Sequence, residues 1–169
     1  FYYLHAYAQL PWKDCQLAVS VPSGNFGNLT AGLLAKRMGL PAARFVAATN
    51  VNDVVPEYLQ RGQFRPRPSL MTISNAMDVG NPSNFARMLD LYGHDLNRLR
   101  GEIWGAGYSD DQTKRAMREV YEHYGYMLDP HGAVGFLGLR EFLKSQSAEW
   151  RGVFLETAHP AKFYDIVEP

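Results

Sequence analysis

The chain has 169 residues, a length that suits one domain with a sizeable core. Its 17 basic and 17 acidic side chains cancel, which argues against nucleic-acid binding and against a polybasic membrane anchor, because both normally need a basic excess. With 46% hydrophobic and 20% charged residues, the composition excludes a disordered chain.

Partners and compartment follow from the same composition. No apolar run approaches the length of about 18 residues that a membrane helix needs, so no membrane partner is expected. The single cysteine, Cys15, cannot form an intrachain disulfide, and we therefore expect a cytoplasmic protein. No metal site is predicted. The opening segment 1–10 is apolar and aromatic rather than polar, which predicts that the chain is a piece of a longer protein.

The first third of the chain predicts a strand, a helix and a second strand. The short apolar run 16–21 predicts a buried strand, since proline and glycine follow it. Residues 29–38 predict a helix, with Asn28 as the expected N-cap and Gly39 at the C′ position. Residues 44–49 predict another strand. A strand–helix–strand unit of this kind predicts a parallel sheet.

The remaining elements are helices and one more strand. Asn52 is expected to cap a short helix over 53–60, and 61–68 is expected to be a loop because it holds one glycine and two prolines. Three further helices are predicted. The first runs from about Asn81 to Leu91, the second begins after the capping-box sequence 109–112 and ends before Gly125, and the third covers 131–143. A last strand is predicted over 152–156. The sequence therefore predicts an α/β fold with a parallel-type sheet flanked by helices.

The sharpest local feature is the sequence Pro-Ser-Gly-Asn-Phe-Gly-Asn over 22–28, between the first predicted strand and helix. Its two glycines permit a tight turn and a close approach of a ligand to the backbone. Free N–H groups at a helix start favour an anion such as a phosphate. Gly24 and Gly27 match neither the P-loop nor the dinucleotide fingerprint, and from spacing alone an ordinary strand-to-helix turn stays open.

A second polar stretch, 74–87, is dense in hydroxyl and amide side chains and contains one guanidinium. That guanidinium belongs to Arg87, near the start of a predicted helix, and a guanidinium can bind an oxyanion through two hydrogen bonds. A solvated loop can have the same composition. Together the two stretches suggest two anion sites, one for a cofactor and one for a substrate.

Five blocks of the sequence, in order, resemble those of threonine synthases, which are pyridoxal-phosphate enzymes of the tryptophan-synthase-like, or type II, fold. The blocks are 22–32, 47–53, 74–79, 129–134 and 156–163. The resemblance covers nearly the whole chain. It implies that residues 1–169 are the C-terminal portion of the cofactor-binding catalytic region, and that the fold is part of the type II fold.

The resemblance also implies an activity and a cofactor. The family converts O-phosphohomoserine and water into threonine and phosphate with the help of pyridoxal phosphate. The residues implied to hold the cofactor are Gly24, Asn25, Phe26, Gly27 and Asn28 at its phosphate and Thr157 at its pyridine nitrogen. The residues proposed for the substrate are Ser74, Asn75, Asp78, Ser83, Asn84 and Arg87.

One family feature does not occur in this sequence. The family's Schiff-base lysine lies in a Phe-Lys-Asp-like motif, and none of the five lysines here has that context. We therefore expect the catalytic lysine upstream of Phe1, no catalytic residue within the chain, and the N-terminal remainder of the same protein as a partner. His131 and His159 lie in matched blocks and are expected to make structural hydrogen bonds, whereas Lys162 is expected at the surface.

Two other functions stay open. One is a threonine-synthase-like phospho-lyase, which removes phosphate from a related substrate without making threonine. The other is a non-catalytic piece that binds a phosphorylated small molecule or only assembles with a partner chain, a reading that the absent lysine motif keeps open.

Overall fold

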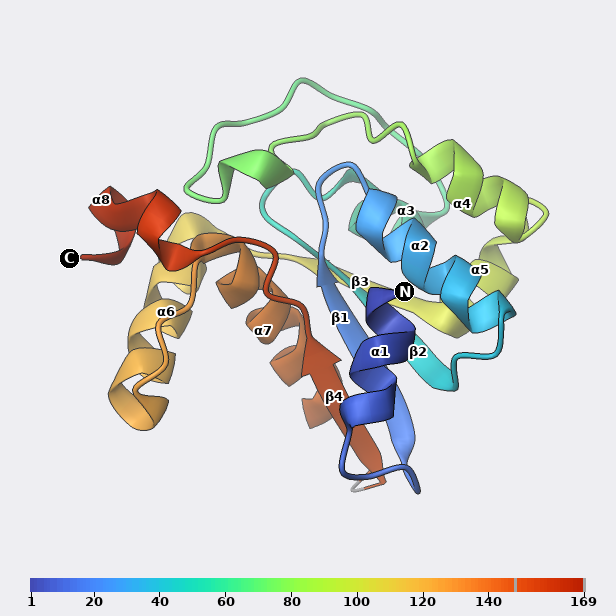
Figure 1. Ribbon diagram of the computed structural model, residues 1–169. Coiled ribbons are helices and arrows are strands. Elements are labelled where there is room, and N and C mark those ends of the chain that lie inside the picture. Colours follow the sequence, from blue (N-terminus) through green and yellow to red (C-terminus); the bar gives the residue numbers. More distant parts are fainter. Residues whose placement is uncertain (148, 169) are drawn as a thin grey trace.

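The computed structural model describes residues 1–147 and 149–168, and its centre is a parallel sheet between two layers of helices (Figure 1). The four strands are β1 (Gln16–Pro22), β2 (Ala42–Thr49), β3 (Ile103–Gly107) and β4 (Trp150–Phe154). They are arranged in the order β3-β2-β1-β4, and every pairing is parallel. The predicted α/β class and parallel sheet are confirmed.

One layer is built from helices of the first part of the chain and the other from helices of the second part (Figure 1). The first layer holds α1 (Tyr2–Gln9), α2 (Gly27–Arg37), α3 (Val54–Arg61), α4 (Phe85–Leu91) and α5 (Leu96–Glu102). The second holds α6 (Asp110–Tyr124) and α7 (Pro130–Lys144), and the short elements are η1 (Asn75–Met77), η2 (Pro160–Phe163) and α8 (Tyr164–Val167). No helix among the described residues has the length and apolarity needed to cross a membrane.

The strands supply both layers because side chains alternate along a strand. Val19 and Val21 of β1 belong to the core of the first layer, whereas Ala18 belongs to the core beneath α7. Helix α7 lies close to the sheet, since a Cβ atom at Gly138 would lie 2.8 Å from the Cβ atom of Ala48. This packing holds the N-terminus of α7 at the end of the sheet where the strands finish.

Several predicted elements are confirmed, and their end signals act as expected. Strands occupy most of the three predicted ranges, and the stretch after Arg61 has neither helix nor strand until η1. Ser109 and Gln112 form the predicted capping box at the start of α6. Gly125 ends that helix in the left-handed conformation, with a φ of 64°.

The predicted helix starts were wrong at three places. Helix α2 begins at Gly27 rather than Leu29, and its N-cap is Phe26, not Asn28. Helix α3 has Asp53 as its N-cap because the Asn52 side chain is engaged elsewhere in the fold. Helix α4 begins only at Phe85, since the residues after Asn81 first form a turn in which the Phe85 N–H donates to the Pro82 carbonyl.

Three longer elements were not predicted: α1, α5 and β3. Strand β3 has the sequence Ile-Trp-Gly-Ala-Gly, in which two glycines weaken the usual strand pattern. Glycine is favoured at 105 because a Cβ atom there would make tight contacts, 3.2 Å from the Leu59 side chain and 3.3 Å from the Ala47 carbonyl oxygen. The close packing of α3 against β3 therefore favours glycine in this strand, and the glycines weaken the sequence pattern by which a strand is predicted.

Candidate functional site

The predicted site residues gather at the carboxyl ends of the strands. Strand β1 leads into residues 22–28, which we call the glycine loop, and β4 leads toward Thr157. The β1–β4 register pairs Ser20 with Phe154, so Ser23 and Thr157 each follow three residues after a paired position. In the described sheet, β1 is also the strand at which the chain order changes direction, and such points are where open α/β sheets bind ligands.

The glycine loop is fixed at both ends. Ser23 is buried, its N–H donates to the Ala48 carbonyl at 2.8 Å, and its hydroxyl donates to the Val21 carbonyl at 2.8 Å. Phe26 has a φ of 61°, a left-handed conformation that non-glycine residues rarely adopt, and its ring is only 2% exposed. Burial of this ring in the core beside α2 stabilises the turn that starts the helix.

Between these anchors the backbone presents a row of free donors. Within the described residues, the N–H groups of Gly24, Asn25, Phe26, Gly27 and Asn28 donate to no protein acceptor. Most of this stretch is exposed, and it leads into the 11-residue helix α2, whose first turn carries no acidic side chain. Convergent N–H groups and the positive end of a helix dipole suit an anion, so these residues fit a phosphate group.

The two glycines of the loop have different neighbours. A Cβ atom at Gly24 would lie 2.7 Å from the Met77 Cα atom and 2.8 Å from the Ala76 carbonyl oxygen, so the fold itself requires glycine there. A Cβ atom at Gly27 would meet only the Asn84 side chain, at 3.4 Å. Packing therefore leaves room for a side chain at Gly27, and the glycine there is better explained by a ligand.

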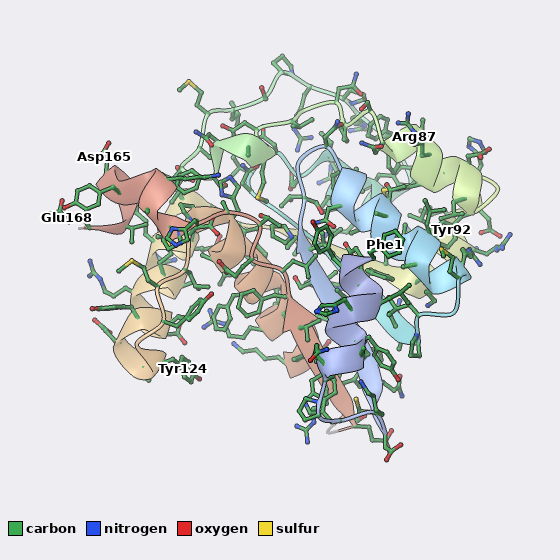
Figure 2. The ribbon with its side chains drawn as sticks, viewed as in Figure 1. Phe1, Arg87, Tyr92, Tyr124, Asp165 and Glu168 are labelled. Atoms are coloured by element: carbon green, nitrogen blue, oxygen red, sulfur yellow. The ribbon has the colours of Figure 1, made fainter. Side chains whose placement is uncertain are left out.

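The segment 83–87 is attached directly to the glycine loop. The Asn25 Oδ1 atom accepts hydrogen bonds from the Ser83 N–H at 2.6 Å and the Ser83 hydroxyl at 3.0 Å. The Asn84 side-chain amide donates to the Asn25 carbonyl at 3.0 Å, and Arg87 donates to Asn84 Oδ1 at 3.1 Å. Arg87 lies on α4, at the surface of the molecule (Figure 2). Three predicted substrate residues are thus placed beside a predicted cofactor residue.

The other predicted substrate residues lie in and around η1, on the other flank of the loop. Asn75 is exposed, whereas Ser74 is buried and its hydroxyl accepts a hydrogen bond from Asn50 at 3.1 Å. The Asp78 carboxylate accepts from the Thr72 hydroxyl at 2.7 Å and from Asn50 at 2.8 Å. Ser74 and Asp78 are therefore already engaged by the protein, and Asn75 is the freest of the three.

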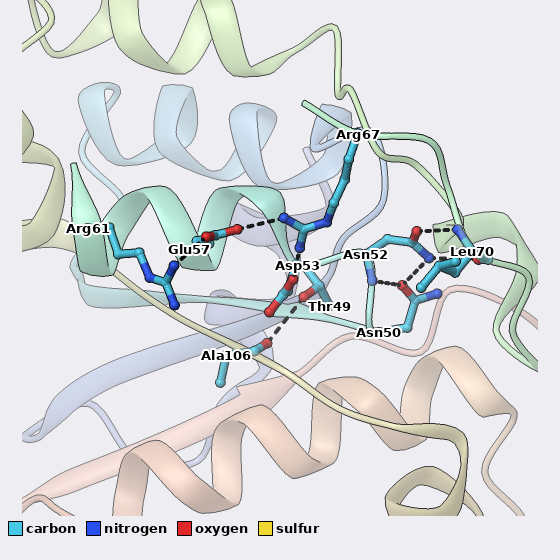
Figure 3. Close-up of polar contacts among 9 residues, drawn as sticks. All are labelled: Thr49, Asn50, Asn52, Asp53, Glu57, Arg61, Arg67, Leu70 and Ala106. Carbon is cyan, nitrogen blue, oxygen red and sulfur yellow. Dashed lines mark hydrogen bonds and ion pairs between the residues drawn. The ribbon is translucent and has the colours of Figure 1, made fainter. Parts of the chain in front are cut away.

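Side chains that follow β2 hold this region in place, whereas the sequence predicted only a helix-capping role for Asn52. Asn52 donates to the Leu70 carbonyl at 2.9 Å and accepts from the Leu70 N–H at 2.8 Å, as Figure 3 shows. Arg67 forms ion pairs with Asp53 and Glu57 of α3. The only signal in the sequence was the matched block 47–53, which contains Asn52 and Asp53 but gives no hint of their partners.

A buried acidic group, Asp129, interacts with Glu156, the residue that precedes the exposed Thr157. Asp129 is fully buried, caps α7, and contacts His131 Nδ1 at 2.7 Å. Burial would raise the pKa of Asp129, but the hydrogen bonds from His131 hold it below its usual value. Glu156 is exposed as a whole residue, but its carboxylate lies against Gly132, and the partial burial there together with the nearby Asp129 carboxylate raises the pKa of Glu156 to about 8.

One cavity among the described residues lies away from the predicted site. It has a volume of about 660 Å³, lies between α6 and α8, and includes none of the predicted site residues in its lining. In the glycine loop, Asn25, Gly27 and Asn28 are exposed.

Comparison with known proteins gives a consistent picture. Residues 2–157 match the family model described as pyridoxal-phosphate dependent enzyme. The chain is 51% identical to the threonine synthase of Serratia marcescens over 99% of its own length and 38% of that protein. It is similar to the crystal structure of threonine synthase from Escherichia coli, with a TM-score of 0.91, 50% identity, and coverage of 99% of this chain and 38% of the other.

A further solved structure carries the cofactor in its description. It is that of PLP-bound threonine synthase from Brucella melitensis, with a TM-score of 0.86, 34% identity, and coverage of 99% of this chain and 40% of the other. In each comparison the chain spans about two fifths of the length of the relative it matches.

Proposed function

The chain belongs to the family of pyridoxal-phosphate-dependent enzymes, and on that premise we propose that it is the C-terminal portion of a threonine synthase. The proposed reaction of the whole protein converts O-phosphohomoserine and water into threonine and phosphate. The observation that carries the proposal is the row of free N–H groups at 24–28, with the Ser83–Arg87 segment attached to it. The identity to threonine synthases over 99% of the chain supports the choice of reaction.

In this proposal the glycine loop binds the cofactor phosphate through backbone N–H groups. When bound, pyridoxal phosphate withdraws electrons from the carbons of the substrate. Thr157 faces the pyridine nitrogen and offers it a neutral hydroxyl, which does not hold the ring protonated as a carboxylate would. This choice suits elimination and replacement chemistry better than transamination.

The substrate phosphate is bound by the segment 83–87. The Arg87 guanidinium supplies a planar pair of donors, and the Ser83 hydroxyl and Asn84 amide lie beside it at the loop. Asn75 lines the opposite side of the loop. Ser74 and Asp78 line the site from within the fold, and their hydrogen bonds keep η1 in position.

The proton-transferring lysine comes from the N-terminal remainder of the protein in this proposal. Of the lysines in the chain, Lys36 lies in the last turn of α2, at the end of the helix away from the glycine loop. The N-terminal remainder is therefore the proposed partner, and it also covers the exposed part of the glycine loop. The proposed compartment is the cytoplasm, in keeping with the single cysteine.

Product analysis tests the proposed reaction. The full-length protein that contains this chain is incubated with pyridoxal phosphate and O-phosphohomoserine, and threonine and phosphate are both measured. The proposal expects the two products in equal amounts. Phosphate without threonine would identify a phospho-lyase instead, and the absence of both products would leave a non-catalytic role.

A further inference from the structure

We propose that His131 is a positioning residue, which holds the η1 turn against the glycine loop and so sets the place of the phosphate-binding backbone. The effect on catalysis rests on the function proposed above. The effect on the backbone rests only on the contacts of this chain. His131 is 3% exposed and touches three segments that are far apart in the sequence.

The two ring nitrogens of His131 have different partners. Nδ1 lies 2.7 Å from the Asp129 carboxylate, and Nε2 accepts a hydrogen bond from the Ala76 N–H at 3.3 Å. A carboxylate can only accept, so Nδ1 carries the proton and Nε2 keeps its lone pair free for Ala76. Asp129 is itself fixed, since it caps the start of α7. The imidazole therefore connects a rigid helix start to the η1 turn.

The η1 turn in its place contacts the loop through backbone. The Ala76 carbonyl oxygen and the Met77 Cα atom lie only 2.8 and 2.7 Å from the point where a Cβ atom would stand on Gly24. No side chain lies between the two segments to absorb a displacement. A shift of Ala76 is therefore passed to Gly24, which carries the first N–H group of the phosphate-binding row.

A third segment packs against the same ring. Phe163 of η2 contacts His131, with 5.0 Å between the ring centroids, and η2 follows shortly after Thr157 in the chain. His131 thus adjoins the segments that carry Asn75 and Thr157, and through Ala76 it reaches the loop. The His131 side chain can therefore hold the proposed cofactor-binding and substrate-binding segments in fixed positions relative to each other.

Two substitutions separate the hydrogen bonds of His131. His131→Gln places an amide oxygen near the position of Nε2, so it can still accept from Ala76. His131→Asn places its amide near the position of Nδ1, so it can donate to Asp129 but cannot reach Ala76.

In the full-length protein, we expect His131→Asn to speed amide hydrogen exchange of peptides covering 74–79 and 23–28 about tenfold. We expect it to weaken pyridoxal phosphate binding by at least about fivefold, and His131→Gln to stay within about twofold of wild type in both.

The control is His123→Asn on the exposed face of α6, which should change neither measurement. The proposal is overturned if the asparagine and glutamine variants behave alike, or if both lose thermal stability with unchanged exchange at 74–79. If His131→Asn does not fold, His131→Gln decides alone, since increased exchange at 74–79 in that variant contradicts the proposal. Exchange is measured without substrate, so a protein that makes no threonine would refute the proposed function and still allow His131 to be tested.

Discussion

The Oδ1 atom of Asn25 accepts a 2.6 Å hydrogen bond from the backbone N–H of Ser83. This bond joins the loop predicted for the cofactor phosphate to the segment predicted for the substrate phosphate. Neither residue is buried, so the bond adds little to the stability of the core. Its main effect is to fix the relative position of two surface segments. Arg87 lies one helical turn from this junction and is oriented by Asn84.

Arg87 tests the substrate side of the junction. Arg87→Lys should lower catalytic efficiency with O-phosphohomoserine by about tenfold or more, because one ammonium cannot replace the paired donors and a lost charged hydrogen bond costs roughly 1.5–3 kcal/mol. Pyridoxal phosphate binding should be unchanged. Steady-state kinetics and a cofactor titration measure the two effects, and equal losses in both would show that Arg87 only supports the fold.

The two loop glycines should respond differently to substitution. Gly27→Val should leave the melting temperature nearly unchanged but weaken cofactor binding at least tenfold, or about 1.4 kcal/mol, because the side chain projects where the phosphate is proposed to lie. Gly24→Ala should lower the melting temperature, since backbone atoms of Ala76 and Met77 must move. Full cofactor retention by Gly27→Val after dialysis would remove the phosphate assignment.

Thr157 tests the position of the pyridine ring. Thr157→Asp should keep cofactor binding within a few fold but cut threonine formation and increase side products, because a carboxylate beside the pyridine nitrogen would stabilise its protonated form. Thr157→Ser keeps the hydroxyl and should retain most of the activity. The measurement is the product ratio at full cofactor occupancy, and wild-type turnover with a wild-type ratio in Thr157→Asp would show that this side chain lies away from the ring.

Glu156 should make stability depend on pH. Its pKa is raised from 4.5 to about 8 in the fold, so between these values the folded state binds more protons than the unfolded state, and stability falls as pH rises. Glu156→Gln removes this dependence. The difference between the melting temperature of the variant and that of wild type should rise steadily, in favour of the variant, from about pH 4.5 to 8. Glu122→Gln on the surface of α6 should show the same pH dependence as wild type. Parallel curves for wild type and Glu156→Gln would contradict the raised pKa.

The sequence predicted the elements whose signals are local. The apolar run of β1, the capping box at Ser109 and the ending glycine at Gly125 depend on neighbours in the chain, and all three are confirmed. Phe26 shows where local rules failed, because the burial of its ring overrides the preference for a polar N-cap at Asn28. Strand β3 was missed for a similar reason, since its glycines serve contacts with α3.

The candidate site was predictable as a list of residues but not as a set of contacts. Composition and resemblance selected Asp78, yet its bonds to Thr72 and Asn50 depend on the path of the loop between α3 and α4. The hydrogen bond between His131 and Ala76 joins residues 55 positions apart in the sequence, and no pattern in either segment predicts it. The roles of the individual site residues remain predictions that the experiments above test.

The most direct measurement is phosphate release from O-phosphohomoserine by the purified 169-residue chain with added pyridoxal phosphate, beside the full-length protein. In our proposal, the phosphate-binding loop lies in this chain and the proton-transferring lysine lies upstream of Phe1. We therefore predict turnover by the full-length protein and none by the chain alone. Sustained phosphate release by the chain alone, abolished by substituting one of its own lysines, would contradict the proposal that the catalytic lysine lies upstream.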